Sequence, residues 1–132
     1  MEIKTPYAFG KTIDLPFAEA DPKVRAELAK EGFGVISEVD VKKKFAEKLK
    51  IDFRNYVILG ACNPPIAHQV LSRELPVGTL LPCNVVLYST DDDKTSVVVM
   101  DPVPPLSMAE HPEVVAHAKE VAEKMHRVIA AL

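Results

Sequence analysis

The sequence lacks several features that would point to a particular class of protein. It has 132 residues with no tryptophan, and aromatic side chains make up only 6% of it. A surface that stacks nucleic-acid bases on aromatic rings is therefore not indicated. The net charge is −3, and a mildly acidic chain has no electrostatic means of holding a phosphate backbone. We expect no nucleic-acid partner.

Long hydrophobic runs are also missing. No apolar run approaches the ~20 residues that a membrane-spanning helix needs, and the N-terminus has no basic region followed by an apolar segment. We therefore expect no membrane association and a cytoplasmic location. The chain is 48% hydrophobic and 27% charged, which is ordinary for a globular protein. At this length it should form one domain, residues 1–132.

Cysteine is scarce, with only Cys62 and Cys83. In the cytoplasm both should be reduced thiols. Two cysteines leave a tetrahedral metal site incomplete, and no C-x-x-C spacing occurs. Glu113 and His117 are four residues apart and could chelate an ion, but an exposed pair on a helix is the commoner explanation. No nucleotide-binding, serine-hydrolase or zinc-protease motif occurs either. We expect no metal and no cofactor.

Hydrophobic periodicity predicts four helices and five strands. Their order is strand, helix, strand, helix, strand, helix, hairpin and a last helix. Strands are expected at 7–15, 33–39 and 54–62 and in a hairpin of 83–90 with 94–101, and helices at 16–31, 41–49, 64–75 and from 112 onward. Gly32 should follow the first helix, and Asp40 and Asn63 should cap the next two. The first helix begins either near Phe17 or after an Asp21 cap, with Pro22 as its first residue. The hairpin and the alternation predict an α+β domain with a mostly antiparallel sheet.

The strand around 56–61 is apolar on both faces, which predicts an interior strand with both sides covered. One layer of amphipathic helices covers only one face, so a second copy of the chain is the simplest cover for the other. Leu106 and Met108, in the proline-rich segment 102–112, fit no periodicity. This segment is either a lid or part of the contact between copies.

Each cysteine is followed by an asparagine, which makes two Cys-Asn pairs. Cys62 ends a strand just before the Asn63 cap, where free backbone N–H groups of a helix favour a thiolate or an anionic ligand. If the strand that Cys83 begins lies beside it, both thiols and both carboxamides would converge. A structural interpretation of both cysteines is the commoner one. Free cysteines pack as small hydrophobes, Cys83 shares a strand face with Val85 and Leu87, and Asn84 lies on the opposite face.

Three blocks of the sequence carry a resemblance to a known family. They are "EGFGVISEVDVKKKFAEKL", "YVILGACNPPIAHQVL" and "VGTLLPCNVVLY", and they resemble successive signature blocks of the domain of unknown function 302 family. The resemblance covers the chain from about Tyr7 to the last helix. It implies a fold like that of the TATA-binding protein, with a curved antiparallel sheet and helices on one face, and it implies a homodimer. It supplies no catalytic mechanism.

The sequence thus predicts a small homodimeric α+β module that binds a small molecule or a partner protein. The expected ligand-binding residues are Cys62, Asn63, Cys83 and Asn84. The alternative is a thiol-dependent enzyme, sulfur carrier or redox protein that uses Cys62 as its catalytic residue. Thiol reactivity discriminates the two, because a binding module should leave Cys62 with an ordinary or masked thiol.

Overall fold

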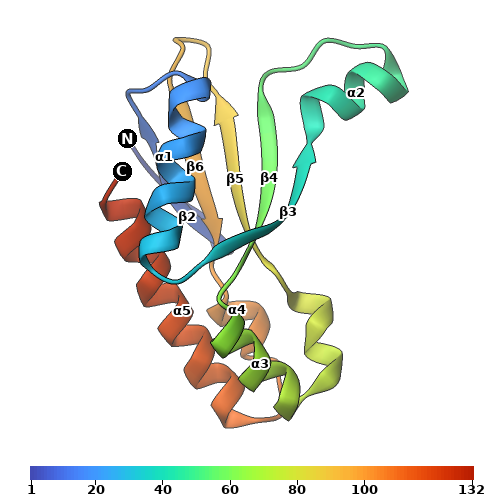
Figure 1. Cartoon of the computed structure of the whole chain (residues 1–132), viewed down its shortest axis with the longest axis vertical. Helices are drawn as coiled ribbons and strands as arrows, with labels where there is room; N and C mark the ends of the chain where they lie inside the picture. Colours follow the sequence, from blue (N-terminus) through green and yellow to red (C-terminus); the bar gives the residue numbers. More distant parts are fainter.

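A single antiparallel sheet with helices packed on it forms the protein (Figure 1). The structure, a computed structural model, describes residues 1–132. Six strands lie in the order β1-β2-β6-β5-β4-β3, and each pairs antiparallel with its neighbours. The strands are β1 Glu2–Lys4, β2 Ala8–Ile13, β3 Gly34–Asp40, β4 Tyr56–Cys62, β5 Cys83–Ser89 and β6 Thr95–Met100. The helices are α1 Phe17–Lys30, α2 Val41–Leu49, α3 Pro64–Arg73, the 3₁₀ helix η1 Leu75–Leu80, α4 Val103–Leu106 and α5 Pro112–Ala130.

The two long helices, α1 and α5, cover one face of the sheet (Figure 1). The apolar stripe of α5 is buried there, with Val114, Ala118, Met125 and Val128 all in the core. Helices α3 and α4 and η1 lie beyond the end of the sheet, and α2 projects from its opposite end. The predicted α+β class, antiparallel sheet and helical layer are confirmed. No helix combines the length and the apolar character that crossing a bilayer would need.

The helix boundaries follow local signals that the sequence carries. The Oδ1 atom of Asp40 accepts a hydrogen bond from the Lys43 N–H at 3.0 Å, which caps α2 as predicted. Gly32 follows the last turn of α1 with φ +85°, a conformation that glycine adopts without strain. Of the two starts considered for α1, the structure has the one at Phe17, and Pro22 lies inside the helix.

Strand β4 is interior, as its two-sided pattern predicts. It lies between β3 and β5, and its Val57 and Leu59 are buried under the helical layer. The predicted hairpin of β5 and β6 forms as well, with its tip at 90–94. The face of β4 that carries Tyr56 and Ile58 has no helix over it, so half of the apolar surface of this strand is left open.

Strand β3 differs from its predicted alternation. A β-bulge between Val35 and Ser37 shifts the register, so that residues on either side of it turn to opposite faces. Val35 pairs with Ala61 on the helical side, whereas Val39 pairs with Ile58 on the open side. The alternating pattern of residues 33–39 predicts Val35 and Val39 on one face, and the bulge makes that prediction wrong. The short strand β1 was not predicted, because three residues are too few for a periodic signal.

A pair of glycine substitutions tests the packing of the sheet. A Cβ atom on Gly10 would overlap the backbone carbonyl oxygen of Val97 on the neighbouring strand. Because backbone cannot move aside as a flexible side chain can, Gly10→Ala should lower the free energy of unfolding by about 3 kcal/mol. Gly34→Ala is the matched control, since its Cβ would meet nothing within 4 Å. Urea denaturation of both variants measures the difference, and equal stabilities would contradict the described pairing of β2 with β6.

Candidate binding pocket

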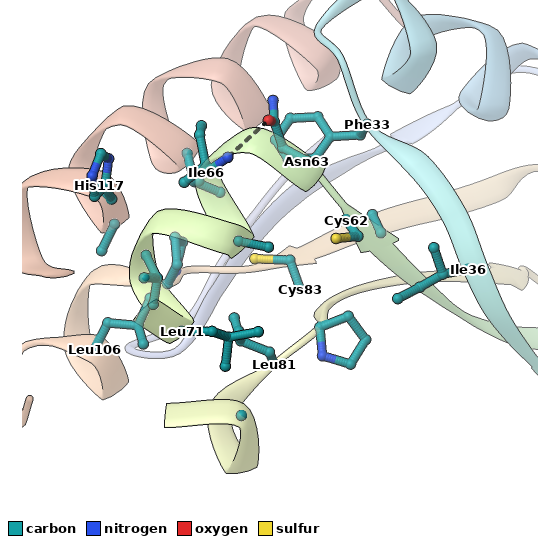
Figure 2. Close-up of a pocket in the computed structure, with 18 residues that line it drawn as sticks. Phe33, Ile36, Cys62, Asn63, Ile66, Leu71, Leu81, Cys83, Leu106 and His117 are labelled. Carbon is teal, nitrogen blue, oxygen red and sulfur yellow. Dashed lines mark hydrogen bonds between the residues drawn. The ribbon is translucent and has the colours of Figure 1, made fainter. Parts of the chain in front are cut away.

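A pocket of about 270 Å³ lies where β4 ends and β5 begins, between the sheet and the helices beyond its end. We call it the end pocket. Of its 18 lining residues 13 are hydrophobic, and none is Lys, Arg, Asp or Glu. They are Phe33, Ile36, Ala61, Cys62, Asn63, Ile66, Ala67, Val70, Leu71, Gly78, Leu81, Pro82, Cys83, Pro102, Leu106, His117, Ala118 and Val121. Figure 2 shows their side chains converging from both sides.

The turn from β4 into α3 builds one wall of this pocket. Asn63 caps α3, and its Oδ1 atom accepts a hydrogen bond from the Ile66 N–H at 3.4 Å (Figure 2). Pro64 follows as the first helical residue, where its missing N–H costs nothing. The Nδ2 atom of Asn63 also donates to the backbone oxygen of Glu31 at 3.4 Å. The same side chain therefore starts α3 and holds it against the end of α1.

An ion pair supports the end of α1 on the other side. The guanidinium of Arg127 on α5 donates through Nε and Nη2 to Oε1 of Glu31, at 3.1 and 3.0 Å. The hydrogen bond from Arg127 lowers the pKa of Glu31. Phe33, which lines the pocket, follows this anchored turn directly. The upper rim of the pocket is thus fixed by contacts among α1, α3 and α5 rather than by one loop.

The two thiols do come together in the pocket. Ala61 of β4 pairs with Cys83 of β5, which places Cys62 beside Cys83 at the strand ends. Figure 2 shows both sulfur atoms directed into the pocket, and both cysteines are free. Cys83 is buried, whereas Cys62 is half-buried. Burial, with smaller effects of Asp101 and Cys62, raises the pKa of the Cys83 thiol to about 12. Cys83 is therefore a neutral thiol at physiological pH.

Asn84 does not join the other three predicted site residues. It pairs with Gly60 on the open face of the sheet, and it is exposed there. The strand alternation that separates it from Cys83 was visible in the sequence. The expectation that two carboxamides would converge with the two thiols is therefore wrong for Asn84, which lines a separate hollow on the open face.

Several residues of the end pocket were not among those predicted. His117 was considered only as a partner of Glu113, yet it lines the pocket and its Nδ1 lies 4.0 Å from Oε1 of Glu120. Leu106 was considered as part of a contact between copies, but α4 buries it in the wall of the pocket within its own chain. Met108 is exposed. One sequence signal could have identified Leu106 as a pocket residue. It is an apolar residue in a proline-rich segment that belongs to no periodic helix or strand pattern.

The donor set of the pocket does not form a metal centre. No group of three or more His, Cys, Asp or Glu side chains lies close enough together to hold an ion. His117 comes from α5, across the pocket from the two thiols in Figure 2. A largely apolar cavity with few polar groups is instead typical of a small-molecule binding site.

Fold and pocket together define a class: a small α+β protein with an open antiparallel sheet and an apolar pocket at one end of it. The family model for the domain of unknown function DUF302 matches residues 9–132, so the chain belongs to that family. A crystal structure of an uncharacterized conserved DUF302 protein from Bacillus stearothermophilus is similar, with a TM-score of 0.85 and 28% sequence identity. The alignment covers 96% of this chain and 98% of that one. The search of curated proteins finds no match.

The capping role of Asn63 can be tested by substitution. Asn63→Ala removes the acceptor for the Ile66 N–H and should lower the free energy of unfolding by about 1 kcal/mol. Asn63→Asp keeps an acceptor at the cap and should lose less. Chemical denaturation of the two variants gives the comparison. An alanine variant as stable as the parent would show that this cap does not hold α3.

The buried thiol of Cys83 should make stability depend on alkaline pH. Its pKa is about 12 in the folded chain against an ordinary 9.0, so only the unfolded chain releases the proton near pH 10. The stabilisation is fully present below about pH 9 and is lost as the pH rises toward 12. Linkage gives a loss of about 1 kcal/mol between about pH 8 and pH 10.

The matched variant is Cys83→Ala, which should lack this part of the pH dependence although the cavity it creates lowers stability at every pH. Urea denaturation at the two pH values measures both slopes. Identical slopes for the parent and Cys83→Ala would mean that the thiol titrates normally and is open to solvent.

Proposed function

We propose that this protein is a binding module for a small, uncharged and largely apolar molecule, held in the end pocket. The observation that carries the proposal is the composition of the pocket wall, which is mostly hydrophobic and has no Lys, Arg, Asp or Glu. Such a wall offers no permanently charged side chain to pair with a charged ligand, whose desolvation would then cost several kcal/mol. The volume of about 270 Å³ is slightly below the usual range for pockets that bind drug-sized molecules, so it suits a compact ligand.

Few polar groups are available to orient a ligand in this pocket. The carboxamide of Asn63 is engaged by Ile66 and Glu31, and the Cys83 thiol is neutral and buried. His117 and Cys62 remain as the half-buried polar groups of the wall. We therefore expect affinity to come mainly from apolar contact, with one or two polar contacts that select the orientation.

A thiol-dependent reaction at Cys62 is the second candidate function. It is favoured by one observation, that Cys62 is half-buried at the pocket wall and so within reach of a bound molecule. An activated nucleophile needs a base or a positive charge beside it. No hydrogen bond joins the Cys62 thiol to a base, and its neighbouring thiol Cys83 stays protonated. The binding function therefore has the stronger support.

We also propose that the protein acts as a homodimer in the cytoplasm. The open face of β4 carries Tyr56 and Ile58 and has no helix over it. Both side chains are only half-buried. An apolar sheet face without cover normally marks an interaction site, and a two-fold contact would cover it in both copies at once. Two free cysteines fit a reducing compartment.

Filling the pocket tests the binding function. Ala67 lines the pocket on α3, so Ala67→Leu should occupy part of the cavity. The probe is 1-aminoanthracene, a neutral fluorescent aromatic. At about 0.5 kcal/mol per heavy atom we expect the parent to bind it with a dissociation constant of about 3 µM. The variant should bind at least about tenfold more weakly, because the added side chain and the probe compete for the same volume.

Two controls make the result specific to the pocket. Ala116→Leu makes the same change at an exposed position of α5, and it should leave binding unchanged. Cys62→Ser should also bind the probe nearly as the parent does if the pocket acts through apolar contact. Equal binding by the parent and Ala67→Leu, measured by fluorescence titration, would refute the end pocket as the binding site.

A further inference from the structure

Two surfaces of the chain are left without a partner by its own helices. One is the arm, which we define as residues 40–55 and which contains α2. The other is the open face, the side of the sheet opposite α1 and α5. We infer that in a homodimer the arm of each copy packs on the open face of its partner. The inference rests on the homodimer proposed above, and it adds the surface and the segment through which the copies bind.

The open face has no charged side chain. Apart from the Gly34–Cys62 pair at the strand ends, the strand registers place fifteen residues on it, all of them apolar or neutral. They are Ile3, Ala8, Gly10, Thr12, Ser37, Val39, Tyr56, Ile58, Gly60, Asn84, Val86, Tyr88, Ser96, Val98 and Met100. Two of the hydroxyls satisfy each other, since Thr12 Oγ1 and Ser96 Oγ are 2.8 Å apart. The face of a sheet that is exposed to water normally carries polar and charged side chains. The lack of charge on this face therefore indicates that another surface covers it.

A hollow of about 370 Å³ lies in the open face, and eight of its ten lining residues are hydrophobic. Tyr56 and Tyr88 stack on its wall, with ring centroids 5.4 Å apart and planes 9° from parallel. Tyr7 also lines the hollow. Partial burial, with Tyr88 and Tyr7 nearby, raises the pKa of Tyr56. The hollow thus offers flat aromatic surface, which is the kind of anchor that protein–protein contacts use.

The arm presents the complementary surface. Figure 1 shows α2 projecting away from the body of the protein, and none of its residues is buried. A helix of nine residues is marginal in water unless its apolar side packs against something. Yet Leu49 is 59% exposed and Ile51 is 46% exposed. Within its own chain, the arm has too few contacts to explain why these positions are apolar.

An aromatic row joins the arm to the open face. The rings of Phe45 and Phe53 meet edge to face with centroids 5.1 Å apart, and Phe53 lies 6.2 Å from Tyr56. Tyr56 in turn stacks on Tyr88 in the hollow. The apolar side of the arm is therefore continuous with the open face, and one partner can cover both together.

A second copy of this chain fits the two surfaces better than other occupants. Each copy carries one arm and one open face, so a two-fold axis satisfies both surfaces of both copies. At usual strand spacings the sheet covers roughly 600 Å², close to the roughly 800 Å² per partner of a stable contact, and the arm adds to it. A nucleic acid is disfavoured, because a face without charge cannot neutralise phosphates.

The distribution of charged side chains also favours a second copy of this chain as the partner. Lys43, Lys44 and Lys48 are exposed on the arm, and the hairpin tip carries the exposed acidic residues 91–93. The arm and the tip lie at the same end of the molecule (Figure 1). When the copies pack with these ends together, the basic arm of one faces the acidic tip of the other, which aligns the two copies.

Sedimentation analysis of three variants tests the inference. Leu49→Lys with Ile51→Lys places charge on the exposed side of the arm, and Val98→Lys places charge in the middle of the open face. Leu75→Lys is the control, because Leu75 is 80% exposed on η1 at the other end of the protein. We expect a dimeric parent, a dimeric control, and a dissociation constant raised at least about a hundredfold in the arm variant and in the face variant.

The outcomes separate the inference from the proposed dimer. A dimeric arm variant beside a dissociated face variant would overturn the arm contact and leave the homodimer. A monomeric parent would overturn both, and would leave another protein as the occupant of the face. Since Val98→Lys could unfold the chain, a second test mixes Leu49→Cys with Val86→Cys, both in a Cys62→Ser background, and adds a short bismaleimide. A cross-linked product with one copy of each variant is expected, and its absence would contradict the inference.

Discussion

The constraint on which the structure depends is that its central strands are apolar on both faces while the chain has helices for only one. Val57 and Leu59 of β4 are covered by α1 and α5, and burying the core on that side drives the fold. Tyr56 and Ile58, on the same strand, have no such cover within the chain. The folded chain therefore leaves one apolar face of its sheet without a covering layer. The open face, the projecting α2 and the expectation of a second copy all follow from that imbalance.

The end pocket arises from the short connection between β4 and α3, which does not let α3 turn back onto the sheet. Strand β4 ends at Cys62 and the next residue, Asn63, already caps α3, and the two prolines that follow fix the direction of the chain. Helix α3 therefore leaves the sheet end and packs against α5 and η1 instead. Side chains from elements far apart in the sequence then surround a space that none of them fills. The thiols of Cys62 and Cys83 line it because they sit where the two strands meet the helices.

Much of this fold could be predicted from local sequence signals. Gly32, Asp40 and Asn63 mark helix ends through their own backbone and side-chain chemistry, and the stripe of α5 is periodic over its whole length. The bulge in β3 could not be predicted, since it depends on pairing with β4. Of the predicted site, Cys62, Asn63 and Cys83 lie in one pocket. Leu106 and His117 were missed as pocket residues because their positions depend on how α4 and α5 pack, which no short stretch of sequence encodes.

Native mass spectrometry of the purified protein tests the homodimer and the end pocket together, because it reports assembly and bound ligand in one spectrum. We expect a species of twice the chain mass of 14.5 kDa, with additional mass from a small molecule that is lost on activation in the gas phase. The Ala67→Leu variant should give the same dimer with less or none of the added mass. A bare 14.5 kDa monomer that also fails to take up 1-aminoanthracene would contradict both the covered sheet face and the binding pocket.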